Sequence, residues 1–181
     1  IVGTYGTLTI GADGSYSYAA DQAAADAIAA GESQNDVFVY TITDGTQDNT
    51  ANITIKVLGA NDNPSAQNDV GVVNEGSTLT VQNSANANVD GSFDANGEHS
   101  GDVIHTTSSS HKDSDLDTND TLRITQIKKS GGDNSSVSSG SSYNSSGTSV
   151  TGSYGTLTIG ADGSYTYVAS SDISGLSDGA T

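Results

Sequence analysis

The chain has 181 residues, no cysteine, 33% hydrophobic residues and a formal net charge of −17 at pH 7. This charge disfavours nucleic acids and anionic membranes as partners and favours cations, while the lack of cysteine excludes a disulfide framework. No apolar run approaches the roughly 18 residues of a membrane-spanning helix, so membrane insertion is not expected, and so acidic and core-poor a chain is expected to fold only when its carboxylates are neutralised.

A β-hairpin is expected at the start of the chain. Residues 4–10 alternate between polar and apolar side chains, which predicts a strand. Asp13 and Gly14 form the dipeptide that is typical of a tight hairpin turn, and a return strand then carries Tyr16 and Tyr18.

One short helix and two strands are expected next. Residues 21–30 are rich in alanine, and Gly31 is a plausible C-cap for a helix there. Alternating apolar side chains predict strands over residues 37–43 and 53–57, with a turn that begins at Asp44.

The pattern is weaker in the second part of the chain. The segment 59–68 holds the only proline and is interpreted as an extended boundary. Weaker strands are expected over residues 70–72 and 79–81, and another over residues 122–124. Residues 130–149 are rich in Gly, Ser and Asn and are expected to form a long flexible loop rather than a core element.

One phrase of the sequence occurs twice. GTYGTLTIGADGSYSY (Gly3–Tyr18) returns as GSYGTLTIGADGSYTY (Gly152–Tyr167), 149 positions later (152 minus 3). We interpret the chain as a tandem-repeat fragment cut out of phase, with residues 1–58 the C-terminal part of one repeat, 59–68 the inter-repeat junction and 69–181 most of the next repeat. Short strands separated by turn signals predict an all-β sandwich with one short helix.

Several phrases carry a further pattern. They are YGTLTIGADGSYSY, DVFVYTITDG (36–45), ANITIKVLGANDNPSAQND (51–69), VNEGSTLTV (73–81) and DSDLDTNDTLRIT (113–125). Together they resemble the VCBS and cadherin-like extender repeats of large bacterial RTX adhesins, over most of the chain but not residues 83–110 or 130–149. The resemblance implies an Ig-like or cadherin-like β-sandwich, calcium at the junctions, and an extracellular protein of the bacterial surface that holds an adhesive region away from the cell.

An acidic cluster is the first candidate calcium site. Four carboxylates lie within eight residues, and Ca²⁺ takes six to eight oxygen ligands that alternate aspartates of an extended loop can supply. An EF-hand is excluded because Thr118 stands where that loop needs Gly and Ile124 where it needs Glu. The four candidate ligands are Asp113, Asp115, Asp117 and Asp120.

The resemblance implies further ligands near the junction. The motif NDNP resembles the linker of cadherin-like repeats, in which side-chain and backbone oxygens bind calcium between domains. Asp44 follows a strand, at the end expected to lie nearest the junction. The candidates of this group are Asn61, Asp62, Asn63, Asp69, Glu75 and Asp44.

Other polar residues are expected to have ordinary structural roles. Asp13 and Asp162 belong to the duplicated hairpin turn, and are interpreted as turn residues. The three histidines, His99, His105 and His111, are spaced too loosely for zinc and are expected at the surface. No motif supports a catalytic site, so the protein is not expected to be an enzyme.

These observations leave more than one function open. The favoured hypothesis is a calcium-stabilised extender repeat whose partners are adjacent repeats of the same polypeptide. A sugar- or peptide-binding adhesion module, using residues 83–111, and a largely disordered acidic spacer are the alternatives. Residues 36–58 are also able to complete the unit 69–181, within one chain or by strand exchange between neighbouring chains.

Overall fold

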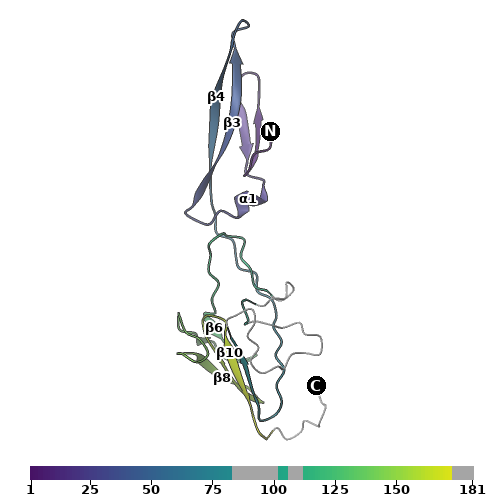
Figure 1. Ribbon diagram of the computed structural model, residues 1–181, viewed down its shortest axis with the longest axis vertical. Coiled ribbons are helices and arrows are strands. Elements are labelled where there is room, and N and C mark those ends of the chain that lie inside the picture. The colour runs from purple at the N-terminus through teal and green to yellow at the C-terminus, as the bar shows by residue number, and fades with distance from the viewer. Residues whose placement is uncertain (83–101, 106–111, 173–181) are drawn as a thin grey trace. The chain divides into compact units, whose positions relative to one another are not determined.

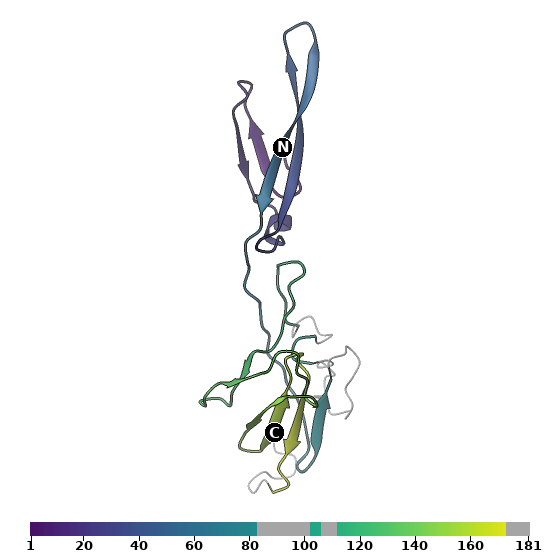
Figure 2. The ribbon, with the colours of Figure 1, turned by 90° about the vertical axis from the view of Figure 1, so that its left-hand side faces the viewer.

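The computed structural model describes residues 1–82, 102–105 and 112–172, and these residues form an all-β structure with one short helix (Figures 1 and 2). The predicted all-β, sandwich-like fold class is confirmed. The chain divides into two compact units. Unit 1 comprises Ile1–Pro64 and Asp115–Thr121, and unit 2 comprises Ser65–Ser114 and Leu122–Thr181. No helix of the described residues has the length and apolarity to cross a membrane.

Unit 1 contains two antiparallel hairpins. Strands β1 (Thr7–Ile10) and β2 (Tyr16–Ala19) form the first, and strands β3 (Ser33–Thr43) and β4 (Asp48–Leu58) form the second. β3 and β4 are longer than predicted because their polar ends continue the pairing, from Ser33 opposite Leu58 to Thr43 opposite Asp48. A strand ladder uses backbone groups, so its ends do not need apolar side chains.

The turn of the first hairpin has the predicted chemistry. Gly14 has a φ of 84°, which an L side chain rarely adopts. The Asp13 carboxylate accepts hydrogen bonds from the Ser15 backbone N–H at 3.1 Å and from the Ser15 hydroxyl at 2.7 Å. The interpretation of Asp13 as a turn residue is therefore confirmed, and Asp162 accepts the same two bonds from Ser164 in the second copy.

A buried carboxylate joins the two hairpins of unit 1. Asp36 of β3 is 4% exposed, and it accepts hydrogen bonds from the backbone N–H groups of Thr4, Tyr5 and Gly6 at 2.8–3.2 Å. The Tyr18 hydroxyl of β2 donates to the same carboxylate at 2.6 Å. Burial by itself would raise the pKa of Asp36, but these hydrogen bonds outweigh it and lower the pKa below its usual 3.8.

The core of unit 1 is small. Leu8, Ile28, Phe38 and Val57 are its buried apolar side chains. The rings of Tyr18 and Phe38 meet edge to face, with centroids 6.2 Å apart. The first hairpin thus packs on the second through the end that is remote from its own turn.

The helix α1 (Ala23–Asp26) is shorter than the predicted segment 21–30. Its C-cap is Ala27, so the expectation that Gly31 caps the helix is wrong. Gly31 instead has a φ of 86° in the turn that leads into β3. Within unit 1, α1 lies at the end opposite to the turn between β3 and β4 (Figure 1).

Unit 2 contains a four-stranded antiparallel sheet in the order β5, β10, β9, β8. A separate pair is formed by β6 (Gln126–Ile127) and β7 (Ser135–Ser136). The strands of the sheet are β5 (Thr78–Val81), β8 (Thr148–Thr151), β9 (Gly155–Ile159) and β10 (Tyr165–Ala169). β9 and β10 are the second copy of the hairpin that β1 and β2 form in unit 1.

The predictions of strands over residues 70–72 and 122–124 are wrong. Residues 70–72 form no strand, and Val70 and Val72 are 52% and 43% exposed. Residues 122–124 also form no strand, and the first strand of this segment is β6. The Ile124 N–H donates instead to the Ala161 carbonyl of the hairpin turn, at 3.0 Å.

The expectation that residues 130–149 lie outside the core is also wrong. Val137 is 8% exposed and packs with Ile159 and Ala161 in the core of unit 2. The Ser141 hydroxyl is buried and accepts the Ala161 N–H at 3.0 Å, and the Ser164 hydroxyl accepts the Tyr143 N–H at 3.1 Å. Serine side chains therefore hold this segment on the hairpin turn, although its composition is typical of a linker.

Candidate metal centre

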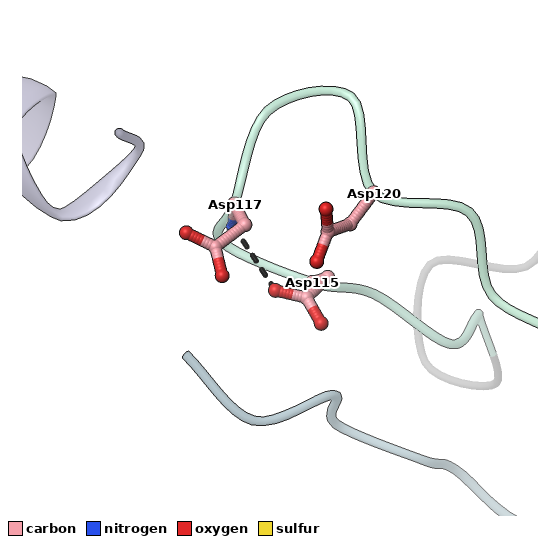
Figure 3. Close-up of side chains that lie close together, drawn as sticks. All are labelled: Asp115, Asp117 and Asp120. Atoms are coloured by element: carbon pink, nitrogen blue, oxygen red, sulfur yellow. Dashed lines mark hydrogen bonds between the residues drawn. The ribbon is translucent and has the colours of Figure 1, made fainter. Parts of the chain in front are cut away.

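Three aspartates of the segment Asp115–Thr121 bring their carboxylates together. One oxygen from each of Asp115, Asp117 and Asp120 lies within 4.8 Å of the other two. The three side chains come from one loop and lie close together (Figure 3). Although the sequence assigns this loop to the later repeat, it belongs to unit 1 of the structure.

Local hydrogen bonds shape the loop. The Asp115 carboxylate accepts the Asp117 backbone N–H at 3.0 Å, which is the turn that aspartate commonly forms with the residue two positions on. Asn119 has a φ of 74°, so the chain reverses there and returns toward Asp120. The Thr118 N–H and hydroxyl both donate to the Ala27 carbonyl, at 3.2 and 2.7 Å, which anchors the loop next to α1.

Asp117 is the buried member of the group. It is 5% exposed, and its Oδ2 accepts the Asp62 backbone N–H at 2.8 Å. Its Oδ1 is buried without a hydrogen-bond partner among the described residues. An unsatisfied buried carboxylate oxygen costs free energy unless a hydrogen-bond donor or a cation satisfies it.

The spacing of the oxygens fits calcium. Ca²⁺ binds oxygens at about 2.3–2.6 Å, so two ligands of one ion are at most about 5 Å apart. The limit of 4.8 Å within the cluster lies inside that span. Mg²⁺ binds at about 2.0–2.1 Å with strict octahedral geometry and retains most of its waters, so a group of three carboxylates on one flexible loop suits it less well than Ca²⁺. Three carboxylates supply part of the coordination shell, and backbone oxygens or water would supply the remainder.

Asp113 is not a member of the group. It belongs to unit 2, where its carboxylate accepts the Gln67 backbone N–H at 2.7 Å. Ser114 forms an isolated bridge with Ser65, which continues this pairing. The four-carboxylate group predicted from the sequence is therefore a group of three in the structure.

The NDNP motif contributes to the candidate centre through its backbone. Asp62 donates its N–H to Asp117, but its carboxylate is not one of the three grouped carboxylates. The Asn61 side-chain amide donates to the Asp62 carbonyl. Asn63 is exposed.

Asp44 does not lie where it was expected. Ser33 pairs with Leu58 at one end of the hairpin and Thr43 pairs with Asp48 at the other, so Asp44 is at the end away from the junction. The reason is that β4 carries the chain back along the full length of β3. The Asp44 carboxylate accepts the Gln47 and Thr46 N–H groups at 2.9 and 2.8 Å, and these bonds lower its pKa.

The last two predicted ligands lie in unit 2. Glu75 is exposed in the turn before β5. Asp69 lies near Tyr165, whose pKa is raised to about 12, first by burial and then by the negative charge of Asp69. The structure groups neither of them with the three carboxylates of unit 1.

Two buried carboxylates are not among the metal ligands predicted from the sequence. One is Asp36, whose position two residues before Phe38 on the inward face of a strand was an available signal. The other is Asp102, 1% exposed, which accepts the backbone N–H groups of Ile104 and His105 and lies 3.1 Å from the His105 ring nitrogen Nδ1. His105 is exposed, as expected, whereas His99 and His111 lie outside the described residues.

No protein-family model, no characterised protein and no solved structure matches this chain.

Proposed function

We propose that this chain is a calcium-stabilised extender repeat of a secreted bacterial surface adhesin. The observation that carries the proposal is the group of Asp115, Asp117 and Asp120, in which a buried carboxylate oxygen has no hydrogen-bond partner in the part of the chain that the structure describes. The duplicated hairpin and the resemblance to VCBS and cadherin-like repeats support the extender role. Adjacent repeats of the same polypeptide are the proposed partners, and the proposed location is the bacterial cell surface.

Calcium acts in this proposal by removing repulsion. The chain carries a net charge of −17, and three of its carboxylates are held within 4.8 Å of one another. Such repulsion destabilises the compact state, and a divalent cation that binds only the folded chain stabilises it. At a free calcium concentration of about a hundred times the Kd, the gain is about 2.7 kcal/mol, which is large for a unit with so small a core.

The ion would also restrain the segment that leads out of unit 1. Asp117 holds the backbone of Asp62, and Thr118 holds the backbone of Ala27. An ion bound by Asp115, Asp117 and Asp120 would therefore fix the acidic loop, and through it the start of the junction. In an array of repeats, junctions restrained in this way make a stiffer rod that projects a distal adhesive region.

Calcium concentration supplies the switch between a loose and a stiff chain. Extracellular modules bind calcium with a Kd of about 10⁻⁴–10⁻³ M. At that affinity the site is empty in a calcium-poor cytosol and filled outside the cell, which suits a protein that is exported before it becomes rigid.

The test is a calcium titration of the whole chain by calorimetry, with melting curves in calcium, in magnesium and in EDTA. We expect binding with a Kd near or below the millimolar range, a higher Tm in calcium than in EDTA and a smaller effect of magnesium. Asp120→Asn is expected to weaken calcium binding at least tenfold, whereas Asp133→Asn, outside the group, leaves it unchanged. Equal stability in calcium and EDTA for the unaltered chain would refute the proposal.

A further inference from the structure

The duplicated hairpin offers an internal comparison, because nearly the same sequence has different neighbours in the two units. β2 (Tyr16–Ala19) and β10 (Tyr165–Ala169) are the return strands of the two copies. In unit 2, β10 lies between β9 and β5, whereas in unit 1, β2 pairs with β1 alone among the described strands. The outer edge of β2 is therefore the edge that β5 covers on β10.

The contacts between β5 and β10 define what such an edge binds. Val81 lies opposite Tyr165 and Leu79 lies opposite Tyr167. The Ala169 N–H donates to the Ser77 carbonyl at 3.0 Å. Since alternate residues of a strand direct their N–H groups to the same side, Tyr165 and Tyr167 also present theirs to β5. Leu79 and Val81 are 3% and 6% exposed, so this strand is part of the core.

A hydroxyl completes the contact. The Thr166 hydroxyl of β10 donates to the Leu79 carbonyl at 3.0 Å and lies 3.4 Å from the Thr80 hydroxyl. Ser17 holds the position of Thr166 in β2, and it is exposed. The edge of β2 thus keeps both the backbone pattern and a hydroxyl at the matching place.

The opposite edge of the first hairpin, which belongs to β1, is paired. Val2 forms a bridge with Thr7, just as Thr151 of β8 lies opposite Thr156 of β9. The Leu8 N–H donates to the Ile1 carbonyl at 2.9 Å. Residues 1 and 2 therefore pair with β1 as β8 pairs with β9. The two hairpins differ at the other edge, where β5 pairs with β10 and no described strand pairs with β2.

The side chains next to the β2 edge are open to solvent. Tyr16 is 56% exposed, and Ile10 is 36% exposed whereas its counterpart Ile159 is 4% exposed. Ile10 and Tyr16 border an open hollow of about 760 Å³, which Val39 and Ile53 of the second hairpin also line. Directly opposed residues of two paired strands lie on the same face of the sheet. A strand that pairs with β2 as β5 pairs with β10 would therefore place its Leu and Val on the face of Tyr18 and Tyr16, beside this hollow.

We propose that the outer edge of β2 is a docking site for an extended segment with the sequence pattern of Ser77–Val81, supplied by a second copy of that segment. The segment adds as an antiparallel strand, with its Leu opposite Tyr18, its second Thr opposite Ser17 and its Val opposite Tyr16. Backbone hydrogen bonds supply affinity and the two apolar side chains supply specificity, as in other cases of strand addition.

The experiment uses the full chain labelled with ¹⁵N and an unlabelled synthetic peptide NEGSTLTVQ, the sequence of residues 74–82. We expect hydrogen exchange of the Tyr16 and Tyr18 amides to slow at least tenfold at saturating peptide. The Ser17 and Ala19 amides should change little, because alternation directs them toward β1. A peptide with Leu79→Asp and Val81→Asp is expected to give no protection.

A matched pair of chain variants tests the hydroxyl. Ser17→Thr reproduces Thr166 and is expected to bind the peptide as tightly as the unaltered chain or several-fold more tightly, whereas Ser17→Ala is expected to bind several-fold more weakly. Equal protection by the Asp-containing peptide would overturn the proposal, and so would protection of Ser17 and Ala19 in place of Tyr16 and Tyr18.

Discussion

The Asp117 carboxylate accepts the backbone N–H of Asp62 at 2.8 Å, across 55 positions of the sequence. This bond joins the acidic loop to the NDNP motif, two of the segments in which calcium ligands were predicted. Only Oδ2 of Asp117 is used in the bond, and Oδ1 remains buried without a partner among the described residues. Asp117 is therefore the residue at which the metal proposal is tested most directly.

Asp117→Asn is expected to abolish the stabilisation by calcium. An asparagine oxygen still accepts the Asp62 N–H, but the side chain loses its charge and one ligand oxygen. In EDTA the variant should be as stable as the unaltered chain or about 1 kcal/mol more stable, because repulsion within the group is reduced. Melting curves with calcium and with EDTA measure both effects.

The control for this variant is Asp13→Asn, which removes one charge from an exposed turn. It should keep the full difference in Tm between calcium and EDTA. A calcium-dependent Tm that survives Asp117→Asn unchanged would remove Asp117 from the proposed ligands.

Asp36→Asn is expected to destabilise unit 1 by about 2–4 kcal/mol. The amide nitrogen would replace one of the two carboxylate oxygens and would face either the Thr4 N–H, which Oδ1 accepts, or the Tyr5 and Gly6 N–H groups, which Oδ2 accepts, so at least one backbone donor would lose its acceptor. Hydrogen exchange should quicken at these three amides. Asp48→Asn is the control, since Asp48 is an exposed aspartate of the same hairpin, and it should have little effect on exchange at Thr4, Tyr5 and Gly6.

The stability of unit 1 is expected to fall at both extremes of pH. Burial, together with the hydrogen bond to Asp36, raises the pKa of Tyr18 to about 12, so its contribution is complete below pH 10 and is lost as the pH rises toward 12. The lowered pKa of Asp36 acts in the other direction, because its contribution is complete above its usual value of 3.8 and is lost as the pH falls below it. The unfolding free energy measured against pH reports both.

Tyr18→Phe isolates the alkaline part of this profile. The variant should lose the decline of unit 1 stability between pH 10 and 12, while unit 2 keeps the decline that comes from Tyr165, whose pKa is also about 12. An unchanged alkaline decline at the amides of β1 and β2 would contradict the role given to Tyr18.

Val137→Ala tests whether the Gly/Ser-rich segment belongs to the core. Val137 is 8% exposed against Ile159 and Ala161, so its truncation is expected to cost about 1–3 kcal/mol. Val168→Ala on β10, where the side chain is 49% exposed, should cost well under 1 kcal/mol. The chain has no tryptophan and eight tyrosines, so tyrosine fluorescence and circular dichroism are suitable measures of unfolding. Equal costs for the two variants would place Val137 outside the core.

The candidate site could be predicted in part. The loop of Asp115, Asp117 and Asp120 was recognisable because closely spaced aspartates are the usual source of calcium ligands in an extended loop. Asp113 and Asp44 could not be separated from them by spacing, since their placement depends on pairing with residues far away in the chain. Asp113 is held by Gln67, and Asp44 is carried away from the junction by the length of β3.

The features that could be predicted from the sequence by itself are those that depend on local chemistry. Alternating apolar side chains and Asp-Gly turns specify the two hairpins, because strand and turn preferences act over a few residues. The tertiary structure alone decided that the acidic loop belongs to unit 1, that Val137 is buried, and that β10 has a second partner strand where β2 has none among the described strands. These outcomes depend on contacts between residues distant in sequence, and no local pattern encodes them. Two nearly identical hairpins can therefore have different surroundings, and this difference is the basis of the docking site proposed at β2.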